Sequence, residues 1–336
     1  MSAFMKNPVL LLGGSGVVGS RVARTLRRLQ PDLPIVIAAR NAEKAAAVAA
    51  QIGGPTTAAS VDLSREDLGL APGASFSAVV TLLKDSFLNS LKYAQARQTP
   101  YVSFASFAFE IGPELAHYVQ RPHSAPIVVL GHVFGGVGTL AALHFARGEI
   151  FERVESIALA GVVDADDQGG PASQADFVRL TEECPSALVR RDGLWRWVGG
   201  QEALREVVDV GGVTRQAQAL PLLDVVSLAA ALDARSLRVD FAGRDKVDGQ
   251  APSTELIVEI AGEGRDGEPV QARYELVDGD VYANLSAHGA ALATERLLGL
   301  AGGPAPGPGL YHPESLLEPE YVLRRLQELG VRVRRA

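Results

Sequence analysis

Pro8 to Gly19 reads PVLLLGGSGVVG, and Ile35 to Arg40 reads IVIAAR. The first segment is an apolar run that leads into three glycines, Gly14, Gly16 and Gly19, with the spacing GxGxxG. The residues that follow repeat apolar side chains at helical spacing. The order of strand, glycine turn and helix, followed by a second apolar strand at this distance, is that of a dinucleotide-binding unit.

Each glycine of such a unit has a physical role. One permits a tight turn, the next lets the backbone approach the pyrophosphate, and the third lets the helix pack on the strand. The free N–H groups and the dipole at the helix N-terminus then favour the phosphates. The sequence therefore predicts a cofactor site whose first contacts come from Gly14, Ser15, Gly16, Val17 and Val18.

The end of the second strand distinguishes between the two nicotinamide cofactors. A site that prefers NAD usually has Asp or Glu there, which accepts a hydrogen bond from the ribose 2′-OH. This chain has Arg40, followed by Asn41 and Lys44, so two cations can face a 2′-phosphate and a guanidinium can lie flat on adenine. We predict NADP(H) as the cofactor. The alternative is that Arg40 and Lys44 are solvated surface charges.

Apolar strands and helices alternate up to residue 131, which is typical of a parallel sheet covered on both faces. We expect Asp62 and Leu63, after the third strand, to lie beside adenine; a helix cap is the competing role for Asp62 or Ser64. Leu82 and Leu83, at the end of the fourth strand, are expected beside the nicotinamide. The expected strands after the second are 57–61, 77–83, 100–104 and 126–130, the last closing the sheet, and the expected helices are 43–52 and 86–97.

Beyond residue 131 the sequence changes to an apolar–polar alternation of period two. We expect an α+β domain over 132–286, with a mostly antiparallel sheet that has helices on one face and either a second subunit or the cofactor on the other. Its expected strands are 154–163, 236–242, 254–261 and 270–277, and its apolar helix is 220–232. Two helices of the tail 287–336, at 287–300 and 319–329, are expected to pack back on the Rossmann domain, 1–131.

Composition excludes several classes of protein. A chain of 336 residues with 47% hydrophobic and 21% charged residues suits a two-domain globular enzyme. The net charge of −7, without a basic stripe, argues against nucleic acid as a partner. The single cysteine, Cys184, excludes an intramolecular disulfide and agrees with a cytoplasmic location. The uncharged run 127–146 contains two histidines and four glycines, which favours strand, loop and helix over a membrane span.

The chain resembles the saccharopine dehydrogenase-like NADP-binding oxidoreductases. The resemblance is carried by GGSGVVGSRVARTL, IVIAARNAEKAAAVA and VDLSREDL, and near the end by GLYHPESLLEPEYVLRRLQELGV. It implies hydride transfer between a nicotinamide and an imine or amine of a small-molecule substrate, and an α+β domain that forms a homodimer. Two positions depart from the family: Ser103 stands where an aspartate is frequent, and Phe134 of GHVFGG stands where a GxxPG turn has proline.

Hydride transfer needs an acceptor carbon held over the nicotinamide and a proton donor or charge stabiliser nearby. His132 is the first candidate for the acid or base, because it follows a strand in a glycine-rich turn and titrates near neutrality. A structural hydrogen bond is its alternative role. Lys84 could pair with a substrate carboxylate or be solvated. The remaining candidates at this edge are Asp85, Ser103 as a catalytic residue, and Ser106 as a cofactor contact.

An acidic, glycine-containing segment, DADDQGGPAS, is a further candidate. It could form a loop over the site that binds an amine, or it could be an acidic surface loop. Its residues of interest are Asp166, Asp167, Gly169 and Gly170.

Other chemistries lack their motifs. The chain contains no YxxxK, GxSxG, HExxH or GxxxxGK[ST], which argues against short-chain dehydrogenase chemistry, serine hydrolysis, a zinc site and nucleotide triphosphate hydrolysis. The leading hypothesis is an NADP(H)-dependent oxidoreductase acting on C=N or C–N bonds. The alternative is a non-catalytic NADP(H) sensor or regulatory protein, which the departures at Ser103 and Phe134 keep open.

Overall fold

The computed structural model describes residues 7–165, 167, 169–245 and 251–336, and the chain divides into two compact units. The first unit contains the chain up to Ser106 together with Glu110–Gly131 and Ala287–Leu317. The second contains Phe107–Phe109, His132–Ser286 and Glu318–Ala336.

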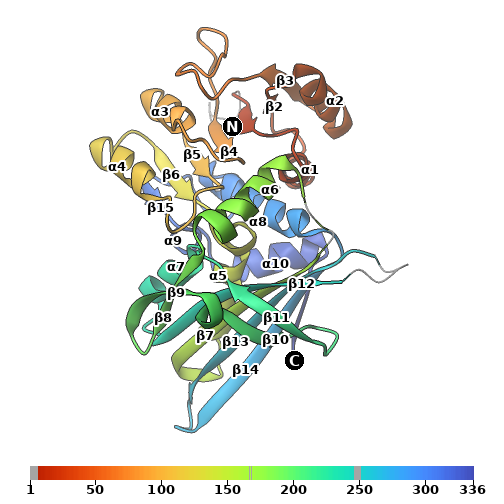
Figure 1. Ribbon diagram of the computed structural model, residues 1–336. Helices are drawn as coiled ribbons and strands as arrows, with labels where there is room; N and C mark the ends of the chain where they lie inside the picture. The colour runs from red at the N-terminus through yellow and green to blue at the C-terminus, as the bar shows by residue number, and fades with distance from the viewer. Residues whose placement is uncertain (1–6, 166, 168, 246–250) are drawn as a thin grey trace. The chain divides into compact units, whose positions relative to one another are not determined.

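The first unit is built on a sheet of seven parallel strands in the order β15-β6-β5-β4-β1-β2-β3 (Figure 1). From β3 to β6 this is the strand order of the Rossmann fold, which confirms the expected parallel sheet. The strands are β1 (Val9–Leu12), β2 (Ile35–Ala39), β3 (Thr56–Ser60), β4 (Ala78–Thr81), β5 (Tyr101–Ser103), β6 (Pro126–Val129) and β15 (Gly309–Tyr311).

One expectation for this sheet is wrong: the strand at 126–130 does not close it. Leu310 of β15 pairs with Ile127 of β6, so a segment from the tail adds the edge strand. β15 has only three residues and follows a glycine- and proline-rich stretch, so it is too short for a period-two pattern that would predict a strand. Its pairing depends on β6, which lies far away in the sequence.

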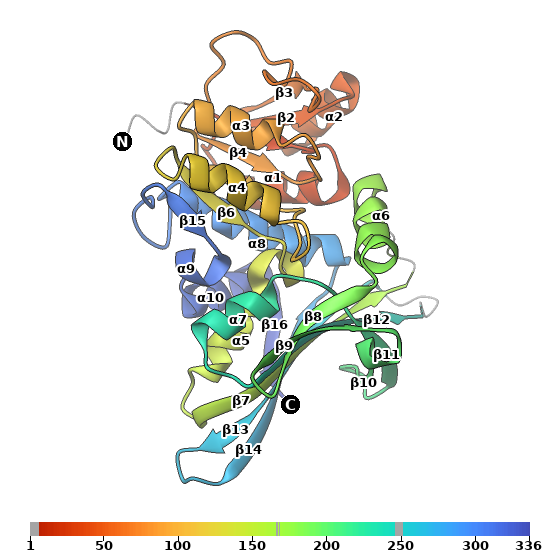
Figure 2. The ribbon, with the colours of Figure 1, turned by 60° about the vertical axis from the view of Figure 1, so that its left-hand side comes forward.

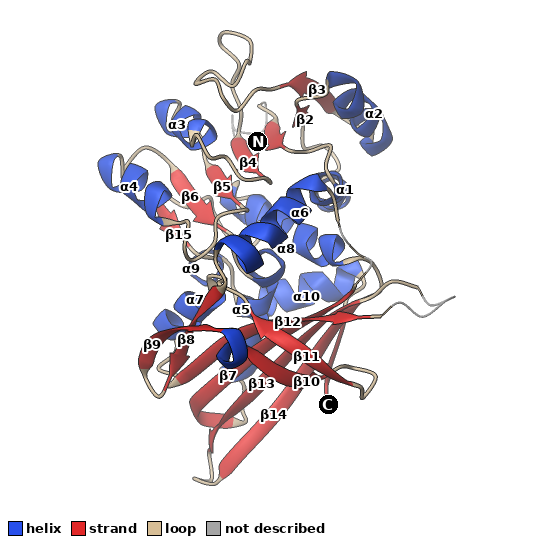
Figure 3. Cartoon of the chain, viewed as in Figure 1, coloured by secondary structure: helices blue, strands red, loops and turns tan. Residues whose placement is uncertain are grey.

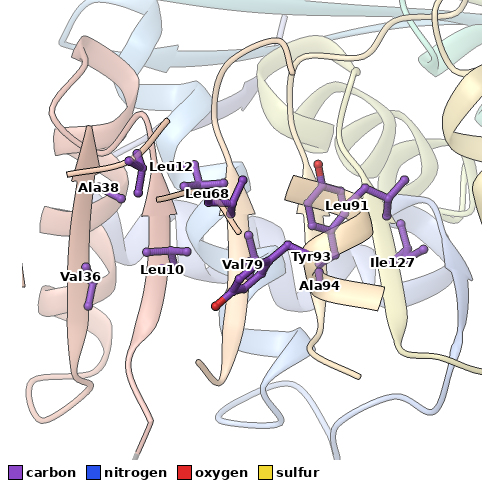
Figure 4. Close-up of a cluster of buried hydrophobic side chains, with 12 residues drawn as sticks. Leu10, Leu12, Val36, Ala38, Leu68, Val79, Leu91, Tyr93, Ala94 and Ile127 are labelled. Atoms are coloured by element: carbon purple, nitrogen blue, oxygen red, sulfur yellow. The ribbon is translucent and has the colours of Figure 1, made fainter. Parts of the chain in front are cut away.

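Helices cover both faces of the first sheet (Figure 3). One face packs Leu10, Leu12 and Val79 against Leu91 of α3, and Leu68 of the loop after β3 joins the same buried cluster (Figure 4). The helices of this unit are α1 (Val17–Leu29), α2 (Ala42–Ile52), α3 (Asn89–Ala96), α4 (Gly112–Gln120), α9 (Pro313–Leu316) and the greater part of α8 (Tyr282–Leu297).

The helix expected at 287–300 does return to the Rossmann unit. His288 Nδ1 of α8 hydrogen-bonds Thr25 Oγ1 of α1 at 3.2 Å. About two turns further along α8, Glu295 Oε1 accepts a hydrogen bond from Gln30 Nε2 at 2.6 Å. Because these polar groups are mostly buried, their pairing fixes the register of α8 against α1.

The second unit contains a mixed sheet in the order β10-β11-β12-β7-β13-β14-β16, with β8 pairing both β12 and β9 (Figure 2). Its pairs are antiparallel except β7 with β12, which run parallel, so the sheet is mostly antiparallel, as expected. A parallel pair requires a crossover, and the segment between these strands supplies it with α6, β8 to β11 and α7. The strands are β7 (Phe151–Asp164), β8 (Ser186–Arg191), β9 (Leu194–Gly199), β10 (Leu204–Val208), β11 (Thr214–Ala219), β12 (Ser236–Arg244), β13 (Thr254–Gly264), β14 (Pro269–Asp278) and β16 (Arg332–Arg335).

Helices α5, α7 and α10 lie on one face of this sheet (Figure 2). The helix at 319–329 was expected to pack on the Rossmann domain, but it belongs to the second unit. The reason is that β16, which follows it directly, pairs with β14, for example through Val333 and Leu276. The helices are α5 (Val137–Ala146), α6 (Pro171–Val178), which runs into a π-helical turn at Arg179–Glu183, α7 (Asp224–Ala231) and α10 (Pro319–Leu329), and two 3-10 turns occupy Val133–Gly136 and Gly200–Ala203.

The uncharged run 127–146 folds as a strand, a turn and a helix, as predicted. Among the described residues, no helix combines the length and hydropathy that a membrane span requires.

We predict that Gly19→Ala destabilises the first unit. A Cβ at this position would lie 2.7 Å from Gly14 Cα and 2.9 Å from the carbonyl carbon of Gly13, so backbone must move. Overpacking of this kind costs roughly 1–3 kcal/mol, which lowers the midpoint of thermal unfolding by several degrees. Circular dichroism measures that midpoint.

Gly112→Ala is the matched control, because a Cβ there meets no atom within 4 Å. Equal midpoints for Gly19→Ala and the wild type would show that α1 does not depend on this close approach.

Candidate functional site

The turn between β1 and α1 has the geometry of a phosphate-binding site. The chain turns at Gly13, whose φ is +80°, and Gly16 N donates to Gly13 O at 2.9 Å. Gly16 is the N-cap of α1, so no side chain caps the helix, and its first turn has no acidic residue. The first N–H groups of α1 can therefore bind an anion, and the assignment of Val17 and Val18 to a pyrophosphate stays a prediction.

The sequence missed Gly13. The GxGxxG spacing assigned the turn to Gly14, yet the positive φ belongs to the preceding glycine. Gly13 N also donates to Ala38 O of β2 at 3.0 Å, which ties the turn to the neighbouring strand. The doubled glycine in LLGGSG was the available signal, since only one of the pair is needed for the spacing.

The end of β4 lies beside this turn. Leu82 N donates to Leu12 O at 3.0 Å, and the side chain of Leu83 packs over Gly13, where its Cγ would be 3.5 Å from an added Cβ. The structure thus brings Leu82 and Leu83 next to the glycine turn. Their role beside a nicotinamide stays a prediction.

A pocket of about 460 Å³ opens where β2 and β3 end. It brings together two residues that the sequence assigned to adenine and the 2′-phosphate, Arg40 and Asp62, and adds Arg65, which the sequence did not single out. The pocket is lined by Arg40, Ser60, Val61, Asp62, Arg65 and Gly69.

The other residues predicted around adenine have local partners. Asn41 is the N-cap of α2 and accepts from Lys44 N at 2.8 Å, while the Lys44 side chain is exposed. Leu63 is half-buried against the core of the unit. Asp62 Oδ1 accepts from Ser64 N at 2.9 Å and Ser64 Oγ at 2.7 Å, and these bonds lower the pKa of Asp62. Asp62 therefore closes a turn, because no helix begins there.

Ser103 and Ser106 converge on a carboxyl group that the sequence did not predict. Ser103 Oγ donates to Glu114 Oε1 at 2.8 Å, and Ser106 Oγ donates to the same oxygen. Glu114 is buried, and among the described residues its Oε2 has no hydrogen-bond partner. Burial raises the pKa of Glu114, although the two serine hydroxyls oppose that effect. No motif marks this residue; it stands in the first turn of α4, a helix that was not expected.

Lys84 forms an ion pair within the first unit, and its pairing with a substrate carboxylate stays a prediction. Its Nζ lies 3.2 Å from Glu110 Oε1, and both side chains are largely buried. The next residue, Asp85, is buried and accepts from Ser90 N and Ser90 Oγ, both at 2.7 Å, so its position is structural. Lys84, Ser103 and Ser106 all belong to the first unit.

His132 belongs to the second unit, where its Nε2 lies 2.8 Å from Ser227 Oγ of α7. The residues after it form a tight left-handed turn, with φ of +48° at Phe134, +63° at Gly135 and +98° at Gly136. Phe134, the position of the family's proline, is buried and meets Phe241 edge-on at 5.7 Å between ring centroids. The hydrogen bond expected under the structural alternative for His132 is therefore present, and its part in proton transfer stays a prediction.

Asp224 holds this turn in place and was also missed. It is fully buried, and it accepts from Val133 N and Thr139 Oγ1, both at 2.7 Å. Burial raises the pKa of Asp224 to about 6, although these two hydrogen bonds act to lower it. A lone acidic residue in the apolar run LPLLDVVSLAAAL was a usable signal, since buried carboxylates are rare without a partner.

The acidic segment after β7 has a structural role in its described part. Asp167 Oδ2 accepts from Tyr282 N, the first residue of α8, at 2.7 Å. Gly169 has φ +61°, and Gly170 is the N-cap of α6. Asp166 lies outside the described residues. Binding of an amine by this loop stays a prediction.

A family comparison assigns the first unit. Residues 9–125 match the family model of the saccharopine dehydrogenase NADP binding domain. Residues 9–125 are therefore similar to the NADP-binding domain of saccharopine dehydrogenases. The glycine turn that an added Cβ would fill, the uncapped α1 terminus and the pocket at Arg40 all fit this cofactor.

Whole-chain similarity is seen with solved structures. Apo saccharopine dehydrogenase (L-Glu forming) from Saccharomyces cerevisiae is 15% identical, with 98% of this chain and 100% of that chain covered and a TM-score of 0.68. An Agrobacterium radiobacter oxidoreductase in complex with NAD+, L-tartaric acid and magnesium is 12% identical, with 98% of both chains covered and a TM-score of 0.49. Apo scyllo-inositol dehydrogenase from Lactobacillus casei is 13% identical, with 99% of both chains covered and a TM-score of 0.49. Comparison with curated protein sequences gave no match.

We predict that Arg40→Asp lowers the preference for NADPH over NADH by roughly 10- to 100-fold, because a charge-assisted hydrogen bond to the 2′-phosphate is replaced by repulsion. Fluorescence titration gives the Kd of each nucleotide. Arg24→Asp, on the exposed side of α1, is the control for the same change in charge. An unchanged ratio of the two Kd values for Arg40→Asp would refute the assignment of Arg40.

We predict a pH-dependent stability from Asp224. Its folded pKa of about 6 lies above its ordinary value of 3.8, so the folded state holds the proton more tightly than the unfolded state. The resulting stabilisation is complete below pH 3.8 and is lost as the pH rises through 6. Relative to Asp224→Asn, the wild type should lose roughly 2 kcal/mol of unfolding free energy between pH 4 and pH 7.

Urea unfolding of both proteins across this range measures the difference. A constant difference between wild type and Asp224→Asn would show that Asp224 is ionised throughout.

Proposed function

We propose that this protein is an NADP(H)-dependent oxidoreductase that transfers hydride to or from a C=N or C–N bond of an amino-acid-like or amine substrate. The observation that carries the proposal is the polar cluster at the ends of β4 and β5, in the unit that binds NADP. In a doubly wound sheet the ligand lies outside the carboxyl ends of the strands. Lys84 and Ser103 occupy that edge, and Ser106 and Glu114 share the cluster.

The charges of this cluster suit an amine or an iminium ion. Lys84 is neutralised by Glu110, which leaves Glu114 and Asp85 as the further carboxyl groups of the region. Because the hydroxyl protons of Ser103 and Ser106 are committed to Glu114, their oxygens can only accept further hydrogen bonds. Acceptors next to an excess of carboxyl groups favour N–H donors and positive charge over a substrate carboxylate.

The roles of the chain's own residues follow from this arrangement. NADPH supplies the hydride when it is bound. Leu82 and Leu83 would lie beside the nicotinamide, where their apolar side chains would limit the access of water. His132 is the proposed proton donor or acceptor, with Ser227 holding its ring.

A non-catalytic NADP(H) sensor is the second candidate. It is favoured by the position of Ser103, whose hydroxyl is committed to Glu114 where the related enzymes often have an aspartate. In that case cofactor occupancy would control assembly or a partner.

We also propose a cytoplasmic homodimer. The strand β9 pairs only with β8 among the described strands, and its Trp195 and Trp197 side chains are about half exposed. An exposed edge with large apolar side chains is typical of an interface.

Substrate panels test the proposed reaction. We expect NADPH oxidation, followed at 340 nm, with a keto acid or aldehyde only when an amine is present, because the reducible group is the imine. Reactions that lack either partner are the controls. Turnover of the carbonyl compound alone would contradict the C=N assignment, and tight NADPH binding without turnover of any pair would favour the sensor.

A further inference from the structure

The loop after β3, residues 62–70, contributes Asp62, Arg65 and Gly69 to the lining of the pocket at Arg40. Leu68 in this loop adopts φ +57° and is completely buried in the core beside Leu10 and Leu12. Asp62 N donates to Leu68 O at 3.0 Å, and Leu68 N donates to Arg65 O at 3.1 Å. These contacts fix the backbone from which Arg65 extends.

The guanidinium of Arg65 is oriented by a bidentate ion pair. Arg65 Nε donates to Asp67 Oδ1 and Arg65 Nη2 donates to Asp67 Oδ2, both at 2.8 Å. Gly69 N donates to Asp67 Oδ1 at 2.8 Å and so holds the carboxylate in turn. The Arg65 side chain and the backbone N–H of Gly69 lower the pKa of Asp67, so the pair stays ionised.

The two guanidinium groups of the pocket differ in charge and in available surface. Arg40 makes no ion pair with any residue that the structure describes, so its full charge is available to a phosphate. The charge of Arg65 is balanced by Asp67, which also occupies the Nε and Nη2 edge of the guanidinium. The Nη1 group and the two flat faces of the guanidinium remain for a ligand. Such a face stacks on aromatic rings, and adenine is the aromatic part of the cofactor.

We propose that Arg65 is the adenine platform of this pocket, held in plane by Asp67, and that Arg40 alone serves the 2′-phosphate. This division moves the stacking role from Arg40, where the sequence suggested it, to a residue of the β3 loop. It concerns nucleotide binding and does not depend on the reaction proposed above, so a failure of one leaves the other standing.

The test compares the Kd of NADPH and of NADH for the wild type, Arg65→Ala and Arg65→Lys by fluorescence titration. Loss of the platform should raise the Kd of NADPH and the Kd of NADH by the same factor, roughly tenfold, and leave the ratio of the two Kd values unchanged. Arg65→Lys keeps the charge without the planar group, so it should resemble Arg65→Ala. Arg153→Ala is the matched control, because Arg153 is equally exposed and ion-paired, on β7 of the second unit.

Two outcomes would overturn the proposal. A loss confined to NADPH would make Arg65 a phosphate ligand, and unchanged affinities would make the Arg65–Asp67 pair a surface ion pair without a ligand. The wild type gives a measurement that needs no variant. On addition of 2′,5′-ADP, the ring current of a stacked adenine should move the side-chain proton resonances of Arg65 upfield, and unmoved resonances would contradict stacking.

Discussion

The close approach of Gly19 to the backbone of Gly13 and Gly14 is the contact on which the nucleotide-binding unit depends. It lets α1 start directly above the end of β1, so the helix N-terminus points at the carboxyl edge of the sheet. A side chain at Gly19 would push the helix away and move its free N–H groups. A pyrophosphate bound at this helix N-terminus would leave the end of β2 for the adenosine half of the dinucleotide and the end of β4 for the nicotinamide half.

The sequence predicted the strands and the glycine turn of this edge well, because each of these elements is local or set by fixed spacing. A glycine turn followed by a second strand defines the neighbours of β1, and adjacent parallel strands end at the same edge. Arg40 and Asp62 consequently share one pocket, as expected. The same logic placed Leu83 next to the turn, although it assigned the tight turn to Gly14, whereas the positive φ belongs to Gly13.

The rest depends on contacts between distant segments. β15 completes the first sheet by pairing with β6. β16 extends the second sheet by pairing with β14, and this pairing places α10, which directly precedes β16, in the second unit. Short strands without alternating residues give no sign of such partners. Glu114 escaped notice for a related reason: its hydrogen-bond partners are Ser103, at the end of β5, and Ser106, in the loop that follows. Asp224, by contrast, was visible as the only charge in an apolar helix.

Two kinds of carboxyl chemistry emerge from the structure. Asp67 is exposed and ionised, and it orients a guanidinium beside a nucleotide pocket. Glu114 and Asp224 are buried, with pKa values raised by burial, and each organises donors in its own unit: two serine hydroxyls for Glu114, and a backbone N–H and a threonine for Asp224. The exposed carboxylate therefore orients a cation, whereas each buried carboxyl fixes a loop of its own unit.

The central claim is that NADP binds along the carboxyl edge of the first sheet, from the glycine turn to the pocket at Arg40. Hydrogen–deuterium exchange of the intact protein, with saturating NADP+ and with the same concentration of NAD+, tests it most directly. The account predicts slower exchange at residues 13–20, 38–44 and 60–70 with NADP+, and weaker protection of 38–44 with NAD+. Unchanged exchange in these three segments at saturating NADP+ would contradict it.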